Sequence, residues 1–185
     1  MHLNYQTKRL DLRILKPGDE HTILDFYERN RDFLEPVEPT RVNNFYTAEY
    51  QRNNLYWEYN AFIKFQYIRM WIFCHNEQIP LGCICFSEMQ KSVFSRCMLG
   101  YKLDKTACHQ GYMLEALAFL LPIVAKEYGL RRIEAMVMPN NLPSIHLLER
   151  LGFIKEGYLH AFAQINGTLE DHLLYTYLTD NGISQ

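Results

Sequence analysis

Alternating and helical hydrophobic patterns divide the chain into short strands and amphipathic helices. Residues 9–15 alternate apolar with charged side chains, which predicts a half-buried strand. Leu55, Tyr59 and Phe62 recur at helical spacing, so residues 47–67 predict a long helix packed on a neighbour. By the same criteria, strands are predicted over residues 70–74, 79–87, 93–103, 132–138, 153–165 and 172–178, and helices over residues 20–29, 111–128 and 141–151.

The order of these elements favours a mixed α/β sheet in a single domain over residues 1–185. A meander of strands comes first, and then strands alternate with helices, which differs from a regular doubly wound sheet. Asn166-Gly167 lies between the last two strand patterns and is typical of a tight hairpin. Pro122 lies inside the helix pattern of residues 111–128 and predicts a kink or a break there.

Composition narrows the class of protein. The formal net charge is -2, which argues against a cationic nucleic-acid binder. No apolar run approaches the ~18–20 residues of a membrane span, and the first residues lack a signal-peptide core, so we expect a cytoplasmic protein. The 5 cysteines contain no CxxC pair, which predicts reduced thiols and no metal site.

Aromatic residues are abundant and many fall between Phe45 and Trp71. The chain holds 13 Tyr, 11 Phe and 2 Trp. Such density is typical of a packed core, and it also suits a surface on which a ligand stacks. We expect most of these rings in the core, and the sequence leaves open that a few of them line a ligand site.

A strand, a loop and a helix start follow one another between Gly100 and Met113. The strand pattern MLGYKL runs into DKTACHQG and then into GYMLEAL. Backbone N–H groups and the helix dipole at such a junction favour an anion, typically phosphate. Gly111 would let the ligand approach the backbone closely. The residues match neither a P-loop nor a dinucleotide-binding fingerprint, and an ordinary strand–helix turn is the alternative interpretation.

The segment PNNLPSIHLLERLGF, residues 139–153, predicts a short capped helix. Asn141 suits the N-cap, where its side chain would accept a hydrogen bond from the amide of Ser144. Pro143 fits the first turn because no donor is needed there. The Ser144 hydroxyl would then lie near the mouth of the helix, either for chemistry or simply as part of the capping turn.

In order along the chain, LGYKL, the loop with Gly111, MLEAL, MPNNLPSIHLLERLGFIKEGY and INGTLEDHLLYTYL resemble the GNAT acetyltransferase superfamily. The segments TKRLDLRIL, NRDFLEPVEPTR and KEGY are similar to its RimJ/RimL-type branch of ribosomal-protein-alanine N-acetyltransferases. The resemblance spans residues 7–178. It implies a central, twisted, mostly antiparallel sheet of about seven strands, splayed between two central parallel strands and flanked by about four helices.

The resemblance also implies a function. Acetyl-CoA would donate an acetyl group directly to a primary amine, most simply a protein N-terminus of the ribosomal-protein alanine type. A small-molecule amine (a polyamine, an amino acid or an antibiotic) is the alternative acceptor. The alternative that is not an enzyme is a non-catalytic acyl-CoA-binding module. Monomer and homodimer are both open, and no nucleic acid, membrane or metal partner is expected.

By the same resemblance, three groups of residues would hold acetyl-CoA. The pantetheine arm would pair with the strand backbone, the pyrophosphate would lie on the loop amides, and two residues would flank the sulfur. These groups are Leu99, Tyr101 and Leu103; Cys108, His109, Gln110, Gly111, Tyr112 and Met113; and Asn141 and Ser144.

The chain departs from the family pattern at positions that concern chemistry. Cys108 stands where the loop pattern has a polar side chain, and we expect weaker CoA binding through the amides that remain. Leu148 stands where many N-terminal acetyltransferases carry a tyrosine general acid. Ser144 is therefore the candidate proton donor to the departing thiolate.

The sequence indicates the general base less clearly than the proton donor. A neutral amine is required, and an α-amine with pKa near ~8 is already partly neutral at neutral pH, whereas a lysine amine near ~10.4 is not. Some RimL-like members use a glutamate at the place of Ala163, so that base is missing. Glu88 is the catalytic candidate, with His160 and Glu156 as alternatives, and a backbone N–H in residues 99–103 would stabilise the oxyanion.

Overall fold

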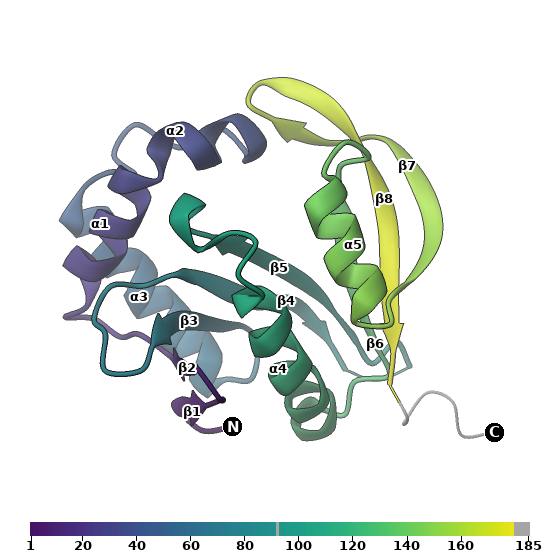
Figure 1. The fold of residues 1–185 in the computed structure, drawn as a ribbon, viewed down its shortest axis with the longest axis horizontal. Helices are drawn as coiled ribbons and strands as arrows, with labels where there is room; N and C mark the ends of the chain where they lie inside the picture. The colour runs from purple at the N-terminus through teal and green to yellow at the C-terminus, as the bar shows by residue number, and fades with distance from the viewer. Residues whose placement is uncertain (92, 180–185) are drawn as a thin grey trace.

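Eight strands form one open sheet in the computed structural model, which describes residues 1–91 and 93–179 (Figure 1). The sheet order is β1-β2-β3-β4-β5-β6-β8-β7, and only the β5–β6 pair is parallel. The strands are β1 (Asn4–Gln6), β2 (Leu10–Arg13), β3 (Ile68–Cys74), β4 (Gly82–Gln90), β5 (Arg96–Leu103), β6 (Arg132–Val137), β7 (Ile154–Ile165) and β8 (Thr168–Leu178).

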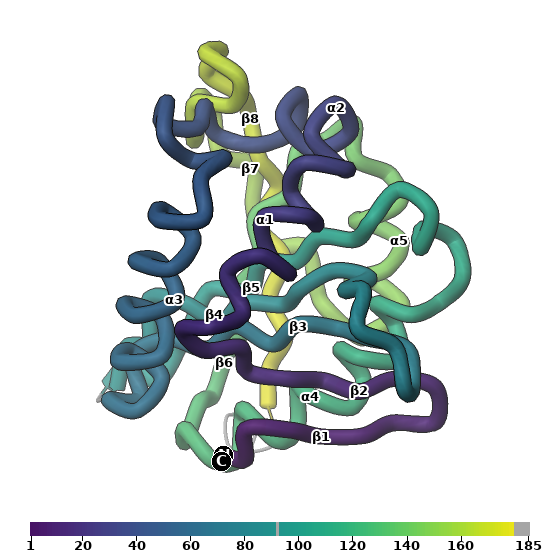
Figure 2. Tube along the Cα trace, turned by 90° about the vertical axis from the view of Figure 1, so that its left-hand side faces the viewer, coloured from purple at the N-terminus to yellow at the C-terminus, as the bar shows by residue number. Residues whose placement is uncertain are grey.

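Helices cover both faces of the sheet. On one face the core joins Leu10 and Ile84 to Leu117 and Leu120, and on the other Trp71 packs with helix residues from the first half of the chain. Figure 2 shows α3 and α5 on opposite sides of the strands. The α-helices are α1 (Glu20–Arg29), α2 (Arg31–Leu34), α3 (Ala48–Ile63), α4 (Tyr112–Tyr128) and α5 (Leu142–Arg150), with short 3-10 turns η1 (Glu35–Val37) and η2 (Lys105–Ala107).

The parallel pair β5–β6 is splayed, as the family resemblance implies. The two strands pair only over Arg96–Met98 and Arg132–Glu134. On its other side, β5 keeps its pairing with β4 as far as Leu103. The backbone of residues 99–103 therefore has a ladder partner on one edge only, and its second edge is open to a ligand.

The expected fold is confirmed, with small differences in the count of elements. The described residues form eight strands and five α-helices where about seven strands and about four helices were expected. The additional strand β1 has 3 residues and the additional helix α2 has 4. Segments this short carry too little periodicity to be recognised from sequence, because an alternation or a helical stripe needs more than one repeat.

Candidate active site

The loop between β5 and α4 ends in a helix start that suits an anion. Gly111 is the N-cap of α4 with φ +77°, and no side chain caps this end of the helix. The first N–H groups of a helix have no partner within it, so they remain available to a ligand. His109, Gln110 and Gly111 are exposed. The residues present therefore fit a pyrophosphate bound to main-chain amides.

An arginine far away in sequence lies beside this loop. The Arg9 guanidinium donates to the carbonyl oxygen of Gln110 at 3.0 Å, and its Nε lies 2.6 Å from a carboxylate oxygen of Glu115. It also stacks over the ring of Tyr112, 4.6 Å from the centroid. Sequence analysis missed Arg9, because only the pairing of β2 in the sheet brings residue 9 to residue 110.

Cys108, in the loop, and Met113, at the start of α4, are packing residues. The Cys108 thiol donates to the carbonyl oxygen of Asp104 at 3.4 Å, and burial raises its pKa, so the thiol stays protonated at neutral pH. Met113 is in the first turn of α4 and is buried in the core. Asp104 in turn accepts from Asn30 at 2.9 Å, which ties the loop to the end of α1. Neither side chain is presented as a nucleophile.

A pair of hydroxyl groups lies at the open segment of β5. The Tyr101 and Ser144 hydroxyl oxygens are 2.6 Å apart. The predicted cap of α5 is confirmed, since the Asn141 side chain accepts from the Ser144 amide at 3.2 Å. Burial raises the pKa of Tyr101 to about 12, although the bond to Ser144 opposes this shift. The Tyr101 hydroxyl is therefore protonated at neutral pH. Tyr101 was expected to contact the pantetheine arm through its backbone, and the sequence did not indicate a role for its hydroxyl.

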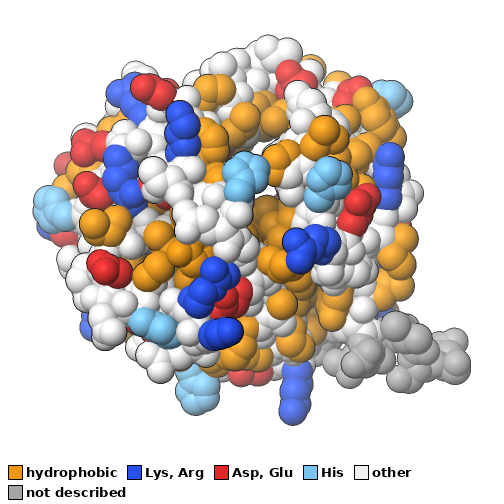
Figure 3. Space-filling view, viewed as in Figure 1, with side chains coloured by type: hydrophobic (Ala, Val, Ile, Leu, Met, Phe, Trp, Pro, Cys, Tyr) orange, Lys and Arg blue, Asp and Glu red, His pale blue; other side chains and the backbone are white. Residues whose placement is uncertain are grey.

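The two faces of β5 carry different chemistry. Side chains alternate along a strand, so Tyr101 points to the face covered by α5 and Lys102 to the opposite face. Leu99 and Leu103 lie on the same face as Tyr101. Figure 3 shows the α4–α5 face of the molecule hollowed in its upper middle, with hydrophobic side chains inside the hollow.

The three candidate bases do not join this group. Glu88 is exposed on a bulge of β4, roughly 13 Å along the strand from the residue opposite Tyr101. Glu156 is paired with Arg132 at 2.6 Å, near the closed end of the β5–β6 pair. The side chain of His160 is 84% exposed on β7. Within the described part of the chain, none of the three is bonded to Tyr101 or Ser144.

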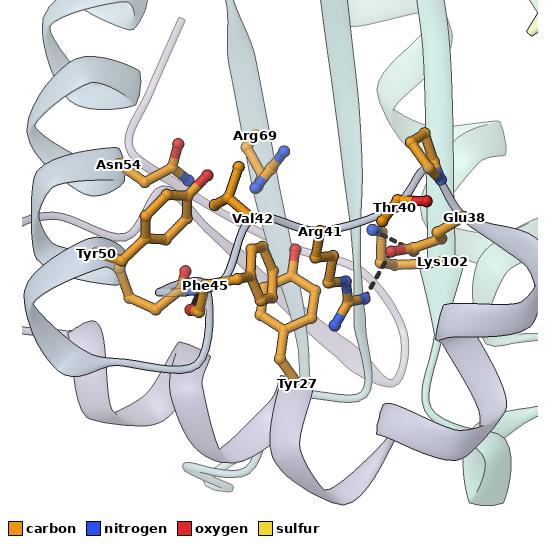
Figure 4. Close-up of a pocket in the computed structure, with 12 residues that line it drawn as sticks. Tyr27, Glu38, Thr40, Arg41, Val42, Phe45, Tyr50, Asn54, Arg69 and Lys102 are labelled. Atoms are coloured by element: carbon orange, nitrogen blue, oxygen red, sulfur yellow. Dashed lines mark hydrogen bonds and ion pairs between the residues drawn. The ribbon is translucent and has the colours of Figure 1, made fainter. Parts of the chain in front are cut away.

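A cavity of about 300 Å³ lies on the other face of β5, between α1, α3 and the segment that joins α2 to α3 (Figure 4). Its floor includes Lys102, which is ion-paired with Glu38, while Arg41 contacts the same carboxylate at 2.6 Å. Burial works against ionisation of Glu38, but Lys102 and Arg41 hold the pKa of its carboxyl below the usual value. Phe45 and Tyr50 line the cavity, so some of the aromatic cluster borders open space.

The tip of the last hairpin touches the rim of this cavity. The amide of Asn166, in the turn between β7 and β8, donates to the carbonyl oxygen of Glu38 at 3.1 Å. Figure 1 shows this turn reaching across the top of the molecule toward α2. The hairpin and the α2–α3 segment thus bridge the end of the molecule at which β5 and β6 diverge.

Two observations concern metals and membranes. Among residues 1–91 and 93–179, no three His, Cys, Asp or Glu side chains are grouped so that they could hold a metal ion. No helix in the same residues is both long and apolar enough to span a membrane. All five cysteines are free thiols.

Comparison with known proteins agrees with this geometry. The model of the family described as "Acetyltransferase (GNAT) domain" matches residues 9–154. The chain is 32% identical over 171 residues to the probable N-acetyltransferase YjcK of Bacillus subtilis, covering 92% of this chain and 94% of the relative. It is also 32% identical over 179 residues to the [ribosomal protein uS5]-alanine N-acetyltransferase of Escherichia coli, covering 94% of this chain and 89% of the relative.

Solved structures give the same result. The ribosomal-protein-S5-alanine acetyltransferase of Vibrio fischeri superposes with a TM-score of 0.93 at 28% identity, covering 99% of this chain and 100% of that one. RimJ of Mycobacterium smegmatis, in complex with a CoA disulfide, has the same fold, with a TM-score of 0.89 at 21% identity, covering 98% and 90% of the two chains. The chain belongs to the GNAT acetyltransferase family and is an acetyl-CoA-dependent N-acetyltransferase.

Proposed function

We propose that the acceptor is the α-amine of a protein N-terminus, of the kind presented by a ribosomal protein that begins with alanine. The observation that carries this proposal is the arrangement around β5. A hydroxyl pair lies on the cofactor side of its open segment, and a cavity rimmed by the last hairpin lies on the other side. The E. coli and V. fischeri relatives, which act on ribosomal protein S5, support the same acceptor class.

In this proposal the main chain and the hydroxyl pair perform the chemistry. The loop amides around Gly111 hold the pyrophosphate of acetyl-CoA, with Arg9 beside them. The open backbone of residues 99–103 binds the pantetheine arm, and one of its N–H groups stabilises the oxyanion. As the C–S bond breaks, Ser144 donates its proton to the leaving thiolate while the Tyr101 hydroxyl hydrogen-bonds to the Ser144 oxygen, and the serine regains a proton from solvent.

The scarcity of bases near this pair supports an α-amine over a lysine side chain. Glu38 is the carboxylate that lines the cavity, and its lowered pKa makes it a poor proton acceptor. Burial raises the pKa of Glu58, but this side chain does not line the cavity, and its carboxylate is paired with Arg69 at 2.7 Å. A lysine amine needs such a group, because its pKa of ~10.4 leaves little of it neutral. An α-amine near ~8 needs much less help, and bulk water can accept its proton.

The charges of the cavity disfavour a polyamine or another polycationic small molecule. One carboxylate, Glu38, lines the cavity together with the cations Arg41, Arg69 and Lys102. A site for a polycation should instead gather carboxylates, since like charges repel strongly where water is excluded. We expect the enzyme to act in the cytoplasm, where ribosomal proteins are made, and its assembly as monomer or homodimer stays a prediction.

A three-acceptor comparison tests the proposal. The substrates are a peptide with a free N-terminal alanine, the same peptide with a blocked N-terminus and one lysine, and spermidine. Thiol release and mass spectrometry should show one acetyl group on the α-amine of the first peptide, at least about tenfold faster than on either alternative. Faster transfer to spermidine or to the lysine would contradict the proposal.

A further inference from the structure

Two residues that line the cavity on the α1–α3 face have buried polar atoms without a hydrogen-bond partner. The Nε of Arg69 and the Oε1 of Gln51 are both buried without a hydrogen-bond partner, and both residues line the cavity. Gln51 is 1% exposed, and its Nε2 donates to the carbonyl oxygen of Phe45 at 2.7 Å. That bond fixes the orientation of the amide, so Oε1 is an acceptor awaiting a donor.

Buried polar groups in folded proteins nearly always have partners, because leaving one unpaired is unfavourable. Four such unpartnered side-chain atoms occur among the described residues, and the other two belong to Trp71 and Tyr128, which do not line the cavity. One unpaired donor and one unpaired acceptor therefore belong to residues that line the same cavity. A peptide segment offers the complementary pair, an N–H for Gln51 and an oxygen for Arg69.

The charges around the cavity indicate whether the oxygen that accepts from Arg69 is neutral or negatively charged. Arg69 is paired through Nη1 with Glu58 at 2.7 Å, and Glu38 lies between Lys102 and Arg41. The three cations that line the cavity are thus paired with two carboxylates, one lining the cavity and one behind Arg69, which leaves one positive charge in excess. Tyr27 and Glu38 raise the pKa of Lys102 despite its burial, so it stays charged. Arg41 and Lys102 lie over the ring of Tyr27, 4.8 and 5.3 Å from its centroid, and Figure 4 shows Arg69 further along the same cavity.

We infer that this cavity binds a carboxylate side chain of the acceptor peptide. This side chain belongs to the second or third residue of the peptide, where the first residue carries the reacting amine. The inference rests on the proposed function, since the ligand is the acceptor itself. Lys102 directly follows Tyr101 on β5, so the cavity lies across one strand from the hydroxyl pair. At about 3.3 Å per extended residue, a peptide whose amine lies at the open segment reaches the cavity within two or three residues.

The size and walls of the cavity agree with one short side chain. A volume of about 300 Å³ is at the low end for ligand sites. Tyr27, Phe45 and Tyr50 give it aromatic walls, against which the methylene groups of a glutamate can pack. The carboxylate would then accept from Arg69 Nε, and the peptide N–H would donate to Gln51.

Matched peptides test the inference. Peptides with N-terminal alanine carry Glu, Gln or Lys at the second or the third position and are otherwise identical. A hydrogen bond to a charged group is worth roughly tenfold or more in binding. We expect kcat/KM for the better glutamate peptide to exceed that of its glutamine counterpart by about tenfold, with the lysine peptide lower still.

Variants assign the preference to the cavity. Arg69→Lys keeps a charge beside Glu58 but loses the planar Nε donor, and should reduce the Glu-over-Gln ratio to near one. The double variant R69Q with E58Q removes both buried charges together and should do the same, which guards against misfolding of the single variant. Arg150→Lys, at an exposed position of α5, is the matched control and should keep the ratio.

The outcomes separate this inference from the proposed function. If peptides are acetylated at equal rates with Glu, Gln and Lys, the α-amine function stands and the carboxylate site is overturned. If no peptide is acetylated, the proposed function fails, and calorimetry with N-acetylated Glu and Gln peptides in the presence of CoA tests the cavity alone. Tighter binding of the Glu peptide, lost in Arg69→Lys, supports the site, and equal or absent binding overturns it.

Discussion

The hydroxyl pair of Tyr101 and Ser144 is the smallest unit on which the proposed chemistry depends. A donor that acts on the departing thiolate works in the transition state more than in the ground state. We therefore expect Ser144→Ala to lower kcat by about 10²-fold while leaving the acetyl-CoA Kd nearly unchanged. Steady-state kinetics with calorimetry measures both quantities.

Tyr101→Phe is the companion variant, because it removes one hydroxyl and keeps the ring. It should lower kcat less than Ser144→Ala if Tyr101 only supports the serine. A Ser144→Ala enzyme with full kcat and a lowered melting temperature would show that Ser144 only completes the capping turn of α5.

Cys108 provides a second test at the same scale. Its thiol donates to the Asp104 carbonyl, and burial raises its pKa, which disfavours the thiolate. Cys108→Ala should keep turnover within about tenfold of the wild type, corresponding to about 1.4 kcal/mol in the barrier. An acetyl group trapped on the cysteine, detected by intact mass, would contradict direct transfer to the amine.

Sequence analysis succeeded with residues whose partners are local and failed with those whose partners are distant. The cap that Asn141 forms with Ser144 spans three residues and was predictable from helix-capping preferences. Arg9 meets the loop across 101 residues, and Tyr101 meets Ser144 across 43. Only the strand order places these groups together. Glu88 was a reasonable candidate from sequence, but the bulge of β4 leaves it away from the hydroxyl pair.

At the scale of elements, the two ends of α4 form a natural control pair. Gly111 and Gly129 both adopt left-handed backbone, with φ 77° and 62°. An alanine at either position should cost about 1–2 kcal/mol of stability, because the left-handed conformation is unfavourable for residues with a Cβ. Only Gly111→Ala, and more strongly Gly111→Leu, should weaken acetyl-CoA binding. Equal acetyl-CoA affinity in the Gly111 and Gly129 variants would remove the loop amides from the site.

The contact between α1 and α3 predicts an acid-dependent stability. Arg52, with Gly18, holds the pKa of Glu20 at about 2, below its ordinary 4.5. Because the pKa of Glu20 is lower in the folded state, its ionised carboxylate stabilises the fold at pH values above about 4.5. This contribution is lost as the pH falls toward about 2. Glu20→Gln should thus melt lower than wild type at neutral pH and equally at pH 2. A difference in melting temperature that does not change with pH would contradict this role.

The observed bounds of helices and strands agree with the predicted ones where the hydrophobic pattern was long and turn residues marked its ends. Helix α1 has the predicted bounds, and the Asn166-Gly167 turn has the positive φ angles of a tight hairpin. Of the kink or break predicted at Pro122, the break was wrong, since α4 continues through this residue, and the kink stays a prediction. Pro122 is on the exposed side of the helix, as is Ala118 one turn before it. Water can there satisfy the carbonyl group that a proline leaves without a donor.

At the scale of the whole molecule, the divergence of β5 from β6 brings together the parts of the proposed site. It opens one strand edge, with the Gly111 loop and the hydroxyl pair on one face and the charged cavity on the other. The residues of the proposed cofactor half could be named from the sequence, because its segments follow one another along the chain. The acceptor half could not, since its walls come from α1, α3, β3, β5 and the segment before α3.

The binding of a bisubstrate adduct tests this arrangement most directly. In the adduct, the CoA sulfur is joined through a –CH₂–CO– group to the N-terminal nitrogen of an alanine peptide. If both faces of β5 are used together, calorimetry should show that the adduct binds at least about 10²-fold more tightly than CoA alone, because the second contact is intramolecular. An adduct joined through a lysine side chain of a blocked peptide should gain much less. An α-amine adduct that binds no more tightly than CoA would contradict the account.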